Sequence, residues 1–268
     1  MKRLRDSLAG ETAYSIQMKG LLLTIAGSVL VTGTCFPQKT PLENLIDKKS
    51  SGWEQIKQMK SSARNSVEIL PKNDLRADSA LFETQFPTSS LIGSMIYECG
   101  GMLIDKGWIR ILGSGCSRLN RSIPEWNKGK SVVKNKTPYS FLLIADDVLG
   151  GFFAIKMNGI DKPDSCAIYY YGPNSLKWKS TGFNYRTFIV YCFSGNLKRF
   201  YGDFRWKGWE EEVEELDGNQ VISCYPLLWT KEGLELKVNR KILSIQRIWE
   251  NYPQQTKYLA EQSYVANK

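Results

Sequence analysis

The chain has 268 residues, 42% hydrophobic and 12% aromatic, with 36 Lys and Arg, 27 Asp and Glu, and no His. This size and composition are typical of a globular protein with one large domain or two small ones, and they exclude a disordered or fibrous chain. Without His, the chain cannot form a Ser-His-Asp triad, a Cys-His dyad, a His-ligated zinc site or an imidazole general base.

The N-terminal region carries the pattern of a secretory signal peptide. An uncharged apolar run from Gly20 to Thr32 follows Lys19 and ends in small residues. A basic start, a short apolar stretch and a small-residue exit describe such a signal. The run is shorter than the roughly 20 apolar residues of a membrane span; a buried core helix is the alternative. We expect residues 1–38 to be a signal peptide and leader, and the protein to be exported to the periplasm or cell envelope.

The start and the exit of this leader each allow two interpretations. Translation from Met18 instead of Met1 would give a compact signal with Lys19 in its basic part. Cleavage between about residues 35 and 38 would be ordinary signal processing, whereas the sequence GTC that ends at Cys35 loosely resembles a lipoprotein site. We therefore expect membrane association only through the signal or through a lipid anchor on Cys35.

Helices and one strand are predicted in the first part of the remaining chain, which we place in a single domain over residues 39–268. Apolar residues at helical spacing predict amphipathic helices over Pro41–Lys49 and Trp53–Lys60. Val67–Leu70 is predicted as a short strand that ends at a proline. A further helix over Ser89–Glu98 is expected to stop at the two glycines that follow.

Strands dominate the middle of the chain. Met102–Asp105 and Trp108–Leu112 flank a Lys-Gly pair at hairpin spacing. Ser117–Asn127 is predicted as a helix. Three runs rich in apolar and aromatic residues, separated by turn residues, then predict adjacent antiparallel strands: Ser140–Ala145, Gly151–Met157 and Ala167–Tyr171.

The last third is predicted to be mainly helical. Tyr185–Phe193 and Leu197–Phe200 form a helix interrupted near a glycine. An apolar stripe from Trp206 to Leu216 predicts a helix with an acidic outer face, and a similar stripe from Ile242 to Tyr252 predicts a helix that ends before Pro253. Together these elements predict an α+β fold with a central, mostly antiparallel sheet flanked by helices.

The charge distribution gives no sign of a nucleic-acid partner. The densest basic stretch lies in a Gly- and Asn-containing segment, which is typical of an exposed loop, and consists of Lys128, Lys130, Lys134 and Lys136. A nucleic-acid surface needs stacking aromatics and a recognisable motif as well. We expect an unknown protein or small-molecule partner instead.

The cysteines are predicted to be mainly buried free thiols. No two of them have the CxxC spacing of a metal knuckle or a redox pair, so no metal or other cofactor is expected. Export would permit disulfides, but Cys166 and Cys192 lie in strongly apolar segments, where buried free thiols are common. We expect at most one disulfide among Cys99, Cys116, Cys166, Cys192 and Cys224.

Several motifs resemble one uncharacterised bacterial family. In chain order they read GGMLIDKGWIRILGSG, FLLIADDVLGGFFAI, IYYYGPNSLKW, SGNLKRFYGDFRWKGWEEEV and CYPLLWTKEG. They are similar to the family catalogued as domain of unknown function 2625, over about Pro41 to Trp249. The resemblance implies no activity, because the family carries none in its name.

A looser likeness is to the SUKH superfamily of small α+β domains, many of which are immunity proteins against bacterial toxins. Its members often show a helix ending in Gly, a hairpin, an acidic Gly-rich turn and an aromatic strand. The glycines at 100–101, the DDVLGG turn and the tyrosines at 169–171 follow that order. Export fits poorly with a cytosolic immunity protein.

The adjacent carboxylates Asp146 and Asp147 allow two interpretations. Two carboxylates can share a proton or hold Ca²⁺ or Mg²⁺. Neighbouring residues on a strand point to opposite faces, so both reach one site only if a turn begins there. We favour a structural role, in which Asp stabilises the DDVLGG turn by accepting bonds from its own backbone, and we expect a positive φ at one of its glycines.

Aromatic and arginine side chains within the motifs are candidates for a binding site. Such residues bury a large area and keep a polar group available, although most Trp in a domain of this size fill the core. The Arg205–Trp209 segment, in which two Trp surround a glycine, is the first choice. The complete set of candidate ligand-binding residues is Trp108, Arg110, Asp146, Asp147, Trp178, Arg205, Trp206 and Trp209.

The sequence thus favours an exported binding or interaction domain without catalytic activity, with no catalytic residues and no metal. The alternative is a carboxylate-based hydrolase that acts on glycans or a similar substrate outside the cytoplasm. Such an enzyme would draw a carboxyl pair from Glu98, Asp105, Asp146 and Asp147, held about 5–9.5 Å apart across a cleft. An aromatic groove without paired carboxylates would favour binding.

Export is testable by expression in a Gram-negative host and sequencing of the mature N-terminus. We expect processing near residue 35 and recovery outside the cytoplasm, because the run from residue 20 to 32 has the composition of a signal. A cytosolic product that begins at Met1 or Met18 would contradict export.

Overall fold

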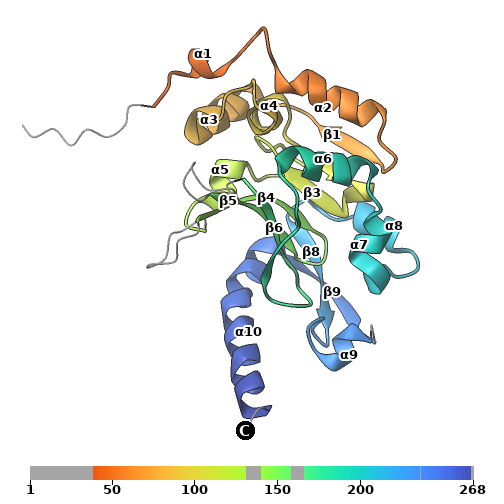
Figure 1. Ribbon diagram of the computed structural model, residues 1–268. Helices are drawn as coiled ribbons and strands as arrows, with labels where there is room; N and C mark the ends of the chain where they lie inside the picture. The colour runs from red at the N-terminus through yellow and green to blue at the C-terminus, as the bar shows by residue number, and fades with distance from the viewer. Residues whose placement is uncertain (1–38, 131–139, 158–165, 236, 267–268) are drawn as a thin grey trace, which may run out of the picture. The chain divides into compact units, whose positions relative to one another are not determined.

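A seven-stranded antiparallel sheet organises the chain (Figure 1). The computed structural model describes residues 39–130, 140–157, 166–235 and 237–266, and residues 39–268 form one compact unit. The sheet follows the chain from one edge to the other, and each neighbouring pair is antiparallel. Its strands are β1 (Val67–Leu70), β2 (Gly101–Ile104), β3 (Ile109–Leu112), β4 (Ser140–Asp147), β5 (Phe152–Met157), β6 (Ile168–Tyr171) and β7 (Trp178–Ser180).

Helices before and after the strands complete the fold, so the predicted α+β class is confirmed. Helices α2, α3, α4 and α6 pack on one another, and a separate hairpin of β8 (Gln220–Tyr225) and β9 (Asn239–Ser244) lies near the C-terminus. The helices are α1 (Leu42–Leu45), α2 (Gly52–Ser61), α3 (Asp74–Thr84), α4 (Leu91–Glu98), α5 (Ile123–Asn127), α6 (Tyr185–Ser194), α7 (Leu197–Tyr201), α8 (Trp209–Glu214), α9 (Lys231–Leu234) and α10 (Ile245–Ala266).

The core is built where apolar residues of the sheet meet this helical layer. Trp108 beside β3 and Phe152 on β5 are fully buried, as are Phe188 and Phe193 on α6. Burial of side chains of this size contributes about 1.5–3 kcal/mol each to folding. The apolar runs that predicted strands in the middle of the chain are therefore core-facing on both sides, with β2 and β3 buried at every position.

Several predicted helices differ from the structure. The helix expected over Pro41–Lys49 is confined to Leu42–Leu45, because the backbone at Ile46 is extended. The helix expected over Ser117–Asn127 begins only at Ile123, because Ser122 and Glu125 form a capping box that sets its start. The helix expected from Trp206 begins at Trp209, because Gly208 has φ = 81° and interrupts the helical backbone.

The C-terminal stripe was also assigned wrongly. Ile242 lies in β9, whereas α10 begins at Ile245 and continues through Pro253. The sequence analysis also missed α3, β7 and the β8–β9 hairpin. In the hairpin, the β9 residues are largely exposed, so they lack the apolar alternation that identifies a strand.

Some predictions concern residues outside the described ranges. These are the signal peptide and leader over residues 1–38, Cys35, and the two basic residues Lys134 and Lys136. No described helix has both the length and the apolar character that a membrane crossing requires.

The five described cysteines are free thiols, four of them buried and Cys166 exposed, so the expectation of mostly buried thiols is confirmed for this part of the chain. Burial raises the pKa of Cys99 to about 12.

The turn between β4 and β5 contains the predicted glycine with positive φ. Gly150 has φ = 88°, a left-handed conformation that glycine adopts without steric cost. A Cβ atom at this position would lie 2.8 Å from Ile248 Cγ2 and 3.2 Å from the Tyr252 hydroxyl. Backbone conformation and space thus both require glycine, and the turn packs directly against α10.

We predict that Gly150→Val lowers the free energy of unfolding by about 3 kcal/mol, from backbone strain and overpacking against α10. Gly182→Val is the matched control, since Gly182 also has a positive φ of 75° but open space around its Cβ position. The control should cost about 1 kcal/mol from strain alone. Chemical denaturation measures both, and equal losses would show that the contact with α10 contributes nothing.

Candidate functional site

Asp146 and Asp147 end strand β4 and are both fully buried. As expected for neighbouring residues of a strand, their carboxylates reach different partners: arginines for Asp146, and tyrosines and turn amides for Asp147. The structure therefore does not combine them into one two-carboxylate site. Each carboxylate belongs to its own network.

Asp146 lies between two buried guanidinium groups. Arg110 faces it across the β3–β4 pair, with Nη2 2.5 Å from Oδ1, and Arg121 Nη1 donates to Oδ2 at 2.6 Å. Burial lowers the pKa of Arg110, and the neighbouring Asp146 counteracts this effect. Breaking a buried ion pair is costly because it leaves a charge without compensation. Asp146, Arg110 and Arg121 thus form a buried charge triad, in which loss of any one member would destabilise the fold.

The remaining donors of the two arginines extend this triad to the β8–β9 hairpin. Arg110 Nη1 donates to the carbonyl of Gln220, the first residue of β8. Arg121 donates through Nη2 to the Gly218 carbonyl and through Nε to Asn219 Oδ1, both at 2.8 Å. The small hairpin is therefore held to the main sheet by hydrogen bonds from charged groups.

Asp147 stabilises the turn, in agreement with the structural interpretation of this residue. Its Oδ1 accepts bonds from the backbone N–H groups of Leu149 at 3.0 Å and Gly151 at 2.8 Å. Its Oδ2 accepts from the hydroxyls of Tyr170 at 2.7 Å and Tyr201 at 3.3 Å. Burial raises the pKa of Asp147, and these donated bonds act in the opposite direction. All four hydrogen bonds that this carboxylate accepts come from groups within the protein.

The other carboxylates proposed for a hydrolase lie elsewhere. Asp105 is paired with Arg205 at 2.6 Å, and Glu98 ends helix α4. Within the described ranges, no three side chains of the types His, Cys, Asp and Glu come together as metal ligands. No two of these four carboxylates therefore face a common cleft, as a hydrolase pair would have to.

The Arg205–Trp209 segment forms a packed cluster with Trp108. The ring of Trp108 lies 5.0 Å from that of Trp209 and 5.9 Å from that of Trp206. The Arg205 guanidinium lies over the rings of Trp108 and Trp209, at 4.7 and 4.3 Å from their centroids. Cation–π contacts of this kind stabilise the packing. This cluster connects α8 to the β2–β3 turn through Asp105, and a ligand role for it stays a prediction.

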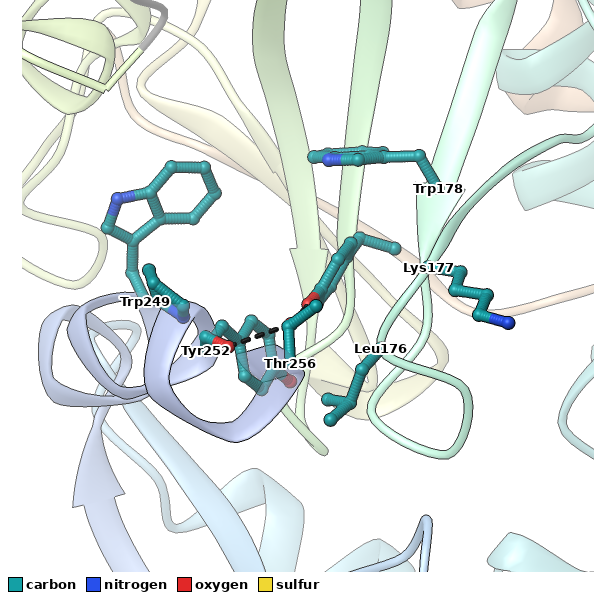
Figure 2. A pocket seen from close by; sticks show the side chains of 8 residues that line it. Leu176, Lys177, Trp178, Trp249, Tyr252 and Thr256 are labelled. Atoms are coloured by element: carbon teal, nitrogen blue, oxygen red, sulfur yellow. Dashed lines mark hydrogen bonds between the residues drawn. The ribbon is translucent and has the colours of Figure 1, made fainter. Parts of the chain in front are cut away.

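The candidate site is a concave surface between the β6–β7 hairpin and α10, with a volume of about 610 Å³. Figure 2 shows Trp249 and Tyr252 on the helix facing Trp178 and Leu176 on the opposite side. We call this surface the aromatic groove. It is lined by Tyr171, Leu176, Lys177, Trp178, Trp249, Tyr252, Pro253 and Thr256.

One predicted residue, Trp178, lines the groove. The others were missed, because Trp249 and Tyr252 were assigned to a core stripe that ended at Pro253. The signal that could have located them is the aromatic enrichment of two segments far apart in sequence, IYYYGPNSLKW and IWENYP. Only the packing of α10 against β6 places these segments together.

Ring contacts hold the groove walls in position. Trp178 stacks on Phe141 with centroids 4.7 Å apart and planes inclined by 12°, and Tyr171 lies 4.8 Å from Tyr252. The hydroxyls of Tyr171 and Thr256 are hydrogen-bonded at 2.7 Å. The groove is therefore built before any ligand arrives.

The groove is also connected to the Asp147 turn. The Tyr252 hydroxyl donates to the Gly150 carbonyl at 2.6 Å. Burial raises the pKa of Tyr252 well above its usual value, so the hydroxyl stays protonated and acts as a donor at neutral pH. Helix α10 is thereby attached to the turn that Asp147 stabilises.

The described lining of the groove offers apolar and aromatic surface but no carboxyl pair for acid–base chemistry. Among the described residues that line it, none carries a carboxylate, and Lys177 is the one with a full charge at neutral pH. Its volume lies in the range of small-molecule sites, about 300–1,000 Å³. An apolar or ring-shaped ligand matches these walls.

Comparisons with known proteins place the chain among proteins of unknown activity. A family model described as protein of unknown function DUF2625 matches residues 42–248. An uncharacterized protein from Haemophilus influenzae is 37% identical over 219 residues, which cover 82% of this chain and 92% of the relative. The uncharacterized protein YbfG from Escherichia coli K12 is 34% identical over 209 residues, covering 78% and 94%. The likeness to the SUKH superfamily stays a prediction.

We predict different effects for the two adjacent aspartates. Asp146→Asn removes the negative charge that two buried arginines share and should lower the free energy of unfolding by about 3–5 kcal/mol. Asp147→Asn should cost less, about 1–3 kcal/mol, because the amide oxygen still accepts the two turn bonds, whereas the NH2 group replaces the oxygen that accepts from Tyr170 and Tyr201. Thermal melts of both variants and of the wild type, with and without Ca²⁺ or Mg²⁺, test this. Metal stabilisation of the wild type that is lost in Asp147→Asn would contradict a purely structural role.

Proposed function

This chain belongs to the DUF2625 family, and we propose that it is a non-catalytic binding domain whose site is the aromatic groove. The observation that carries the proposal is the composition of the groove. Four aromatic side chains line a volume of about 610 Å³, and no described lining residue is acidic. Aromatic rings bury a large area at low conformational cost, which suits them to binding.

The placement of the buried carboxylates supports binding over hydrolysis. Glycan hydrolysis by a carboxyl pair needs two such groups facing a common space, one to transfer a proton and one to act as nucleophile or base. Asp146 is neutralised by two arginines, and Asp147 accepts four hydrogen bonds inside the protein. Neither side chain is accessible to a substrate, because both have no exposed area.

Export is part of the proposal. The apolar run over residues 20–32 after Lys19 supports it, and a lipid anchor on Cys35 is one way to retain the domain at the cell envelope. In that location the groove would meet small molecules, or segments of a partner protein, outside the cytoplasm.

N-phenyl-1-naphthylamine, a neutral aromatic dye that fluoresces in apolar surroundings, tests the groove. We expect saturable binding of one dye per chain. Thr256→Trp should weaken it at least about tenfold, since a bulky ring at a lining position fills the groove. The matched control is Gln254→Trp, an exposed position on the same helix outside the lining set.

The outcomes of this titration separate the alternatives. Equal weakening by the two Trp variants would place the dye elsewhere and contradict the groove as the site. Absence of saturable binding in the wild type would contradict the proposal as well. Circular dichroism of both variants controls for loss of the fold.

A further inference from the structure

The aromatic groove has one open stacking surface. Phe141 lies almost parallel to the indole of Trp178, so it covers one face of that ring. Trp178 also lines the groove, so a ligand can reach this ring from the side of the groove, and Figure 2 shows the indole edge-on across the space from Trp249. A planar ring placed there would extend an existing stack, which is a preferred geometry for aromatic groups.

The surrounding rings restrict the shape of the ligand. Tyr171 contacts Trp178 at 5.3 Å with the planes inclined by 58°, and it contacts Tyr252 at 4.8 Å. On the helix side, Phe152 supports Trp249 and Tyr252 through edge-to-face contacts at 5.0 and 5.7 Å. Because each wall ring is held by another ring, a ligand need not order flexible side chains on binding, which favours a rigid planar molecule.

The charge at the groove favours an anion. Lys177 lies between the turn and β7, is exposed, and has no carboxylate within ion-pairing distance among the described residues. In Figure 2 its ammonium points away from the rings, at the end of a flexible stem that allows it to turn toward a bound group. Burial raises the pKa of both Tyr171 and Tyr252, so neither adds a negative charge. Among the described lining residues, the charged side chain is thus a cation, which attracts an acidic group on a ligand and opposes a basic one.

We infer that the aromatic groove takes a small planar aromatic anion, with its ring on the open face of Trp178 and its acidic group bound by Lys177. The inference rests on the proposed function, because it specifies the ligand class of the same groove. A carboxylate or a sulfonate attached to a two- or three-ring body satisfies both features. Stacking supplies the apolar area, and a charge-assisted hydrogen bond from lysine supplies the preference for an anion.

Two dyes with the same ring system distinguish the contribution of the aromatic ring to binding from the contribution of the negative charge. 8-Anilinonaphthalene-1-sulfonate differs from N-phenyl-1-naphthylamine by one sulfonate, so the ratio of their dissociation constants reports the contribution of the anion. We expect the sulfonate to bind about tenfold tighter to the wild type, as one charge-assisted bond would give. Lys177→Met, which keeps an apolar stem, should abolish this difference. Lys179→Met, at an exposed lysine outside the lining set, should preserve it.

The titrations distinguish results that contradict only this inference from results that contradict the proposed function as well. If both dyes bind equally and Thr256→Trp weakens both, the groove is a binding site but its preference for anions is wrong. If the sulfonate is favoured equally in the Lys177 and Lys179 variants, its charge binds elsewhere, and the inference is wrong. If neither dye responds to Thr256→Trp, the groove itself is not the site, and the inference and the proposed function fail together.

Discussion

The structure depends on a buried carboxylate held between two guanidinium groups. Asp146 pairs with both Arg110 and Arg121, and these arginines in turn donate to carbonyls at the start of the β8–β9 hairpin. These three charged side chains can be buried together because nearly every N–H group of the two arginines has a hydrogen-bond acceptor. The triad joins β3, β4, the segment before α5 and the hairpin, which are far apart in sequence. Removing the central carboxylate would leave excess positive charge in the core.

The next residue of the same strand connects this core to the proposed binding surface. Asp147 fixes the turn by accepting bonds from two backbone amides, and the carbonyl of Gly150 in that turn accepts the Tyr252 hydroxyl. Helix α10 thus packs at a defined position against the end of the sheet, and its aromatic side chains complete one wall of the groove. A single pair of adjacent aspartates therefore organises both the interior and the groove.

This arrangement assigns different tasks to acidic and aromatic residues. The buried carboxylates are satisfied inside the protein, where they stabilise turns and neutralise arginines. The aromatic groove contains rings, hydroxyls and one lysine, which can bind a ligand but offer no carboxyl pair for acid–base chemistry. A binding domain without catalytic activity is the function that this division of tasks favours.

The sequence by itself determined the α+β class, the antiparallel pairing of adjacent strands between residues 140 and 171, and a positive φ in the DDVLGG turn. These features depend on local patterns: apolar runs of strand length, and an Asp followed by glycines that permit positive φ. The position of α10 could not be read in the same way, because its Trp and Tyr have helical spacing whether they face the core or a groove. The exposed β9 strand also has no apolar alternation. Tertiary packing alone decided that Asp146 meets two arginines and that Trp178 faces Trp249 across a groove, since such contacts join segments that local spacing does not relate.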